Sequence, residues 1–169
     1  MVHALPTGRA LWLGCGVLAG LVLSGLLPHA PLHATATDRQ ENFAIATGKV
    51  EDAIEAVYTL DFLTGQLTAA VLNPNTKQFS LIYSRNIMSD LKVEQGKSPK
   101  YLMVTGDADL RGSGQAQMGA SVVYVAELTS GNMGAYALEF SRAWLNTPGS
   151  SQKQFIPLQV VPFRSAAVR

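Results

Sequence analysis

The alternation of apolar and polar residues between residues 53 and 72 predicts a β-hairpin. Every second residue of its first strand is apolar: Ile54, Ala56, Tyr58, Leu60 and Phe62. This period of two is typical of a strand with one buried face, and it continues in the return strand from Leu67 to Val71. Gly65 can take a positive φ in the turn, where Asp61 can accept a hydrogen bond from a backbone N–H two residues on.

The hairpin occurs a second time, 66 residues further along the chain. The aligned positions match without a gap: Val57/Val123, Tyr58/Tyr124, Asp61/Glu127, Thr64/Ser130, Gly65/Gly131, Leu67/Met133, Ala69/Ala135 and Leu72/Leu138. We expect Glu127 to cap its turn less well than Asp61 does, because its side chain is one methylene longer. The chain therefore contains an internal repeat, and this repeat predicts the architecture of the molecule.

The match extends to both sides of the hairpins. Phe43-Ala-Ile-Ala-Thr-Gly48 precedes the first hairpin and Tyr101-Leu-Met-Val-Thr-Gly106 precedes the second, while Lys-Gln-Phe follows both, ending at Phe79 and Phe155. The repeats therefore span residues 43–84 and 101–162. The expected strands are 43–47, 54–62, 66–72 and 78–84 in the first repeat, and 101–105, 120–128, 132–140 and 154–162 in the second. An all-β domain with four antiparallel strands per repeat is the description of β-propeller blades.

The first hairpin carries a sequence motif that resembles a known family. Residues 57–67, Val-Tyr-Thr-Leu-Asp-Phe-Leu-Thr-Gly-Gln-Leu, and more loosely residues 123–133, resemble the V-Y-x-L-D-x-x-T-G-x-L signature of blades in quinoprotein-type bacterial β-propellers. The resemblance implies two stacked blades, where the family has about six to eight. The tryptophan that such blades carry after the glycine is replaced by Ala69 and Ala135, and no quinone site can be matched. The alternative fold is a compact β-sandwich that buries the Tyr58 and Tyr124 faces against each other.

Residues 1–36 are predicted to be a signal peptide or a membrane anchor. An uncharged, apolar run of 18 residues, 10–27, is long enough for either role and predicts an N-terminal hydrophobic helix. Ala34-Thr35-Ala36 has the pattern that a signal peptidase needs, and cleavage there would leave Thr37 at the N-terminus. We therefore expect residues 37–169 to form an exported β domain, periplasmic or at the cell surface, and anchored in the membrane if residues 10–27 are retained.

The composition of residues 37–169 excludes several kinds of chemistry. All three histidines and the single cysteine precede residue 37. The domain therefore has no Ser-His-Asp or Cys-His nucleophile, no ordinary zinc or copper site and no disulfide. Without Arg9 the basic residues number 12, against 12 acidic residues, and this neutral balance argues against a nucleic-acid partner. We expect no cofactor and identify no catalytic residue.

Four residues are candidate contacts for a ligand or partner. Asp107, Asp109 and Arg111 lie in a glycine-rich loop that resembles the start of a calcium site but lacks its later ligands, so an ordinary polar loop is the alternative. Trp144 can stack on a sugar or a partner, or close the end of a sheet. The acids Glu51, Asp52 and Glu55 can be read as paired glycosidase carboxylates or as a solvated edge, and we favour the edge.

These observations favour an exported structural or binding module that self-associates, because two blades leave two outer faces uncovered. Its expected partner is itself, as a homo-oligomer, or another exported protein. If copies close a ring, three chains would supply six blades and four chains would supply eight. The alternatives are a carbohydrate-binding protein or glycan-active enzyme, and a cofactor-binding accessory subunit.

Overall fold

A computed structural model describes residues 37–39, 41–94, 96–110, 117–147 and 149–164. The apolar run of residues 10–27, the expected cleavage site before Thr37 and the candidate Arg111 lie outside these ranges. Across the ranges described, the chain contains no helix with the length and apolar character needed to span a bilayer.

The prediction of an all-β domain is confirmed. The strands are β1 (Thr37–Arg39), β2 (Phe43–Glu51), β3 (Ile54–Asp61), β4 (Gln66–Leu72), β5 (Phe79–Asn86), β6 (Tyr101–Asp107), β7 (Gln117–Glu127), β8 (Asn132–Phe140), β9 (Ser151–Gln154) and β10 (Ile156–Pro162). One 3-10 helix, η1 (Arg142–Asn146), follows β8. The first seven expected strands correspond to β2 through β8. The eighth, 154–162, is divided at Phe155 between the end of β9 and β10.

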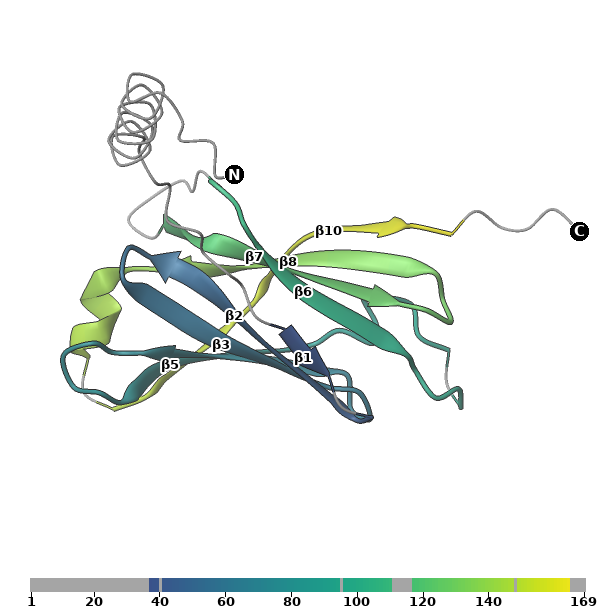
Figure 1. Ribbon diagram of the computed structural model, residues 1–169, viewed down its shortest axis with the longest axis horizontal. Coiled ribbons are helices and arrows are strands. Elements are labelled where there is room, and N and C mark those ends of the chain that lie inside the picture. The colour runs from purple at the N-terminus through teal and green to yellow at the C-terminus, as the bar shows by residue number, and fades with distance from the viewer. Residues whose placement is uncertain (1–36, 40, 95, 111–116, 148, 165–169) are drawn as a thin grey trace, which may run out of the picture. The chain divides into compact units, whose positions relative to one another are not determined.

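The strands form two sheets, which appear as two layers in Figure 1. The first has the order β1-β2-β3-β4-β5-β9 and the second has the order β10-β8-β7-β6. All neighbouring strands are antiparallel except β5 and β9. The first repeat is therefore a four-stranded meander. In the second repeat the chain leaves β8 for β9 in the first sheet and crosses back at the buried Phe155, so that β10 pairs with β8.

The two repeats have the same strand register. Tyr58 lies opposite Ala69 in the first repeat, and Tyr124 lies opposite Ala135 in the second. The turn glycines also correspond, because Gly65 and Gly131 both have positive φ values, 63° and 72°. The similarity between the repeats is thus a similarity of backbone pairing as well as of sequence.

The two repeats bury opposite faces. In the first repeat, Tyr58 is 1% exposed and its face of the sheet lies in the core. In the second repeat, Tyr124 is only half-buried, whereas its neighbours Val123 and Val125 are fully buried. One core cluster includes Tyr58 together with both of these valines. The expectation that a sandwich would bury the Tyr58 and Tyr124 faces against each other is therefore wrong. Instead, the Tyr58 face of the first repeat packs against the Val123 face of the second, and we call this arrangement front-to-back packing.

Close contacts join the two layers beside Tyr58. Its hydroxyl lies 3.0 Å from the Ser121 hydroxyl, and burial raises the pKa of Tyr58 to about 12, although this hydrogen bond lowers it. Gly48 permits the approach, because a Cβ there would lie 2.7 Å from Ser121 Oγ. Between β6 and β2, the Thr105 hydroxyl donates a hydrogen bond to the Thr47 carbonyl at 2.5 Å. These polar contacts fix how the sheets lie on each other.

Glu127 caps its turn more fully than we expected. Its carboxylate is completely buried and accepts hydrogen bonds from the backbone N–H groups of Lys100, Thr129 and Ser130, and from the Thr129 hydroxyl. Asp61 accepts two backbone hydrogen bonds, from the N–H groups of Leu63 and Thr64, and one from the Thr64 side chain. The longer glutamate side chain also reaches the backbone N–H of Lys100, just before β6, so the extra methylene adds one hydrogen bond.

Candidate functional site

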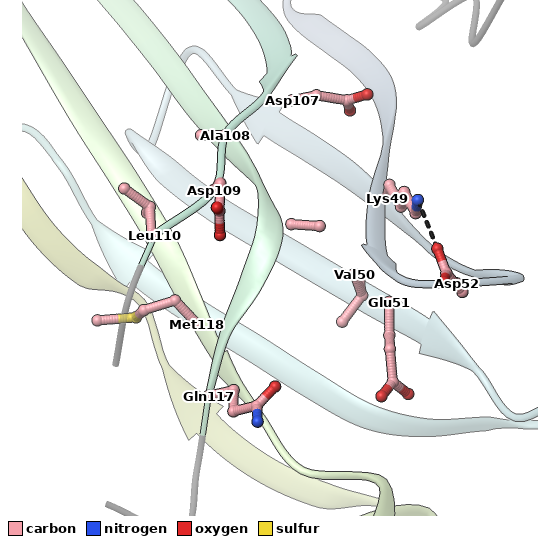
Figure 2. Close-up of a pocket in the computed structure, with 11 residues that line it drawn as sticks. Lys49, Val50, Glu51, Asp52, Asp107, Ala108, Asp109, Leu110, Gln117 and Met118 are labelled. Carbon is pink, nitrogen blue, oxygen red and sulfur yellow. Dashed lines mark ion pairs between the residues drawn. The ribbon is translucent and has the colours of Figure 1, made fainter. Parts of the chain in front are cut away.

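A cleft of about 780 Å³ lies where β2 and β6 end and β7 begins (Figure 2). Its charged lining residues are Lys49, Glu51, Asp52, Asp107 and Asp109. Apolar side chains, among them Val50, Leu110 and Met118, complete the wall. The cleft is therefore a mixed surface, acidic on both sides, in which each repeat supplies carboxylates.

The repeat explains why these side chains meet. Lys49 lies near the end of β2 opposite Glu55, and Asp107 ends β6 opposite Ser121, so the two are equivalent positions of the first strand of each repeat. Stacking the repeats brings these strand ends together at one edge. Ala53, with a φ of 60°, makes the tight turn that places Asp52 beside the cleft.

Two of the cleft's carboxylates are ion-paired. Lys49 Nζ lies 2.7 Å from Asp52 Oδ1, and this hydrogen bond, with the carboxylate's charge, raises the pKa of Lys49. Glu51 Oε2 lies 2.8 Å from Arg142 Nη2, which links the end of β2 to η1. Glu55 is exposed and is not among the lining residues. The three acids considered as glycosidase carboxylates therefore do not converge on one point.

The cleft brings together two of the four candidate contact residues. Asp107 and Asp109 both line it, and Gln117 joins them from β7. Nowhere in the described ranges do three His, Cys, Asp or Glu side chains come close enough to hold a metal ion. The arrangement can offer hydrogen-bond acceptors and a partly balanced set of charges to a polar partner.

Trp144 lies elsewhere, in η1. It packs against the hydrophobic core, and the ammonium group of Lys153 on β9 lies 3.4 Å from the centre of its ring. This is a cation–π contact between the helix and the edge strand of the first sheet. Trp144 is not among the residues that line the cleft. The structure therefore does not join the tryptophan and the aspartates into one site.

The outer face of the second sheet is a surface that the sequence reasoning missed. Two rows of paired residues run across β6, β7 and β8, and we call these six residues the head face: Leu102, Ala126, Met133, Val104, Tyr124 and Ala135. None is charged, and Leu102 and Val104 are 45% and 54% exposed. The signal was present in the unbroken apolar run of residues 122–126, which replaces the alternation seen in the first repeat.

Comparisons with protein-family models, curated proteins and solved structures found no match to this chain. The fold and its surfaces define an all-β protein of two packed four-stranded repeats with an acidic cleft and an exposed apolar face.

Proposed function

We propose that the protein is an exported, non-catalytic structural or binding module that acts through self-association. The head face is the observation that supports this proposal. Adjacent apolar side chains exposed on a flat sheet are typical of protein interaction surfaces, whereas single exposed apolar residues are not informative. Export is inferred from the apolar run 10–27 and from the Ala34-Thr35-Ala36 pattern.

The other surfaces give less support to the carbohydrate-related alternatives. A sugar site usually combines an aromatic face with nearby polar groups. Here Lys153 lies over the ring of Trp144, and the aspartates line a different surface. In the cleft, Asp52 is paired with Lys49 and Glu51 with Arg142. Glycoside hydrolysis needs two carboxyl groups that face the same sugar bond. Here each of these carboxylates is held by a basic side chain instead, which argues against that role.

Light scattering of the full chain in a mild detergent tests the proposal. We expect a mass of more than one chain that increases with protein concentration. Val104→Lys places a charge on the head face and should lower this mass. Leu63→Lys is the matched control, because Leu63 is 70% exposed in a turn outside the head face. A concentration-independent monomer would contradict the proposal, as would an equal mass for wild type and the Val104 variant.

A further inference from the structure

We infer that the head face binds the outer face of the first repeat in a second copy of this chain, so that copies add head to tail. This inference rests on the proposed self-association and specifies its geometry. The partner surface, which we call the tail face, consists of two paired rows across β2, β3 and β4: Thr47, Val57, Ala70, Ile45, Thr59 and Thr68.

The interface within the chain is the basis for the inference. There the Tyr58 face of the first repeat packs against the Val123 face of the second. By the repeat, Tyr124 on the head face is equivalent to Tyr58, and Val57 on the tail face is equivalent to Val123. The two uncovered faces are thus a second copy of the pair that already packs together. Head-to-tail addition continues the same front-to-back stacking.

The head face reproduces the local structure of the buried Tyr58 face. A Cβ placed on Gly48 would lie 3.0 Å from the Tyr58 ring, and one placed on Gly106 would lie 3.5 Å from the Tyr124 ring. In both repeats a glycine of the first strand therefore lies beside the tyrosine of the second. In the first repeat this glycine admits Ser121 of the facing sheet, whereas in the second the corresponding side faces outward.

The tail face has the polarity that the head face requires. Its two rows contain no charged residue, and Ile45 is 47% exposed. Thr47 and Val57 of the first row correspond to Thr105 and Val123, which the chain already buries in its own interface. Charged residues lie beyond the rows, at Lys49, Glu55 and Asp61. An uncharged centre on both faces avoids the cost of burying an unpaired charge.

Two contacts of the internal interface predict two contacts between copies. Tyr58 bonds to Ser121, so the equivalent Tyr124 hydroxyl should lie near Glu55 of a second copy. The Thr105 hydroxyl donates to the Thr47 carbonyl, so Thr47 of a second copy should donate to the Thr105 carbonyl. Because the two faces differ, this contact is heterologous, and its repetition produces a closed ring or an open filament instead of a two-fold dimer.

Complementary variants of the full chain test this geometry by light scattering in detergent. Val104→Lys blocks the head face, and Thr59→Lys blocks the tail face. Each variant alone should be a monomer, because each contact needs one head and one tail. An equimolar mixture should form a dimer that grows no further, whereas the wild type should contain three or more chains. Leu102→Lys and Thr68→Lys are replacements if circular dichroism shows that a first variant is unfolded.

The other outcomes have distinct meanings. If Val104→Lys is a monomer, Thr59→Lys remains a dimer and mixing changes nothing, association is two-fold through the head face. The head-to-tail inference then fails, while the proposed function stands. If all variants keep the wild-type mass, or if the wild type is a monomer, both fail.

Discussion

At the scale of single residues, Glu127 links the stability of the fold to pH. Burial alone would raise the pKa of this carboxyl. Hydrogen bonds from the Thr129 side chain and from three backbone N–H groups outweigh burial and lower the pKa from an ordinary value of 4.5 to about 2. The folded state thus favours the ionised form. Its stabilising contribution is complete above about pH 4.5 and is lost as the pH falls toward 2.

Replacing Glu127 with Gln tests this contribution. The amide keeps one acceptor oxygen but turns its NH₂ group toward a backbone N–H, so we expect a loss of about 2 kcal/mol in the free energy of unfolding at pH 7. Urea unfolding at several pH values measures it, and the difference from wild type should shrink toward pH 2. Asp61→Asn is the control, because Asp61 is only half-buried at its turn and accepts one backbone N–H fewer than Glu127. Equal losses for the two variants at pH 7 would contradict the prediction.

Gly48 and Gly106 provide a second comparison between the repeats. Gly48→Ala should destabilise the fold by about 1–3 kcal/mol, because the new methyl group would lie 2.7 Å from Ser121 Oγ between the sheets. Gly106→Ala should have a small effect, because its nearest contact, at 3.5 Å, is ordinary van der Waals distance. Thermal unfolding of both variants measures the difference. A larger effect at Gly106 would contradict the front-to-back packing.

At the scale of elements, the crossing between the sheets departs most from the repeat. Phe79 and Phe155 occupy the same position in the two Lys-Gln-Phe segments, yet Phe79 is 52% exposed and Phe155 is 2% exposed. The Phe155 ring lies 6.2 Å from the Tyr58 ring and 6.1 Å from the Tyr83 ring, measured between centroids. The aromatic ring thus anchors the chain in the core as it leaves β9 for β10.

Truncating the two phenylalanines should therefore give different results. We expect Phe155→Ala to cost about 3–5 kcal/mol in unfolding free energy, because it leaves a cavity between the sheets. Phe79→Ala should cost much less, since half of that side chain is already in solvent. Chemical denaturation provides both values. Similar losses would show that Phe155 does not hold the crossing.

Residues 87–94, between the repeats, have no strand pattern in sequence, and in the structure they pack against the core. Ile87 and Leu91 are completely buried, and the carbonyl of Leu91 accepts a hydrogen bond from the Asn132 side chain at the second turn. The segment has four apolar residues, Ile87, Met88, Leu91 and Val93, but their spacing shows no sustained period of two and is too short to specify a helix. Their burial depends on the position of both sheets, so the sequence alone could not reveal it.

At the scale of the whole molecule, the two equivalent tyrosines have different roles. Tyr58→Asp should prevent folding, because it places a carboxylate in the core. Tyr124→Asp should leave a folded chain and reduce its association, because Tyr124 lies half-buried on the head face. Circular dichroism and light scattering of the full chain measure folding and mass. Loss of folding in both variants would contradict this assignment of the faces.

The candidate contact residues show which part of a binding site can be predicted from local sequence. Asp107 and Asp109 are two residues apart, so their presence in one cleft follows from their spacing. The other wall of the cleft comes from the β2–β3 turn, and no local pattern joins it to β6. Trp144 is a candidate contact by residue type alone, and its position depends on η1 and β9.

The sequence by itself determined β2 to β8, the hairpin turns and the 66-residue repeat, because each depends on near neighbours: period-two alternation, a turn glycine and a capping acid. Only the tertiary structure decided which face of the second repeat is buried. In a run such as residues 122–126, both faces are apolar, so alternation cannot select the inner one. Front-to-back stacking made that selection, placing Val123 in the core and Tyr124 outside. The cleft and the head face are both consequences of that packing.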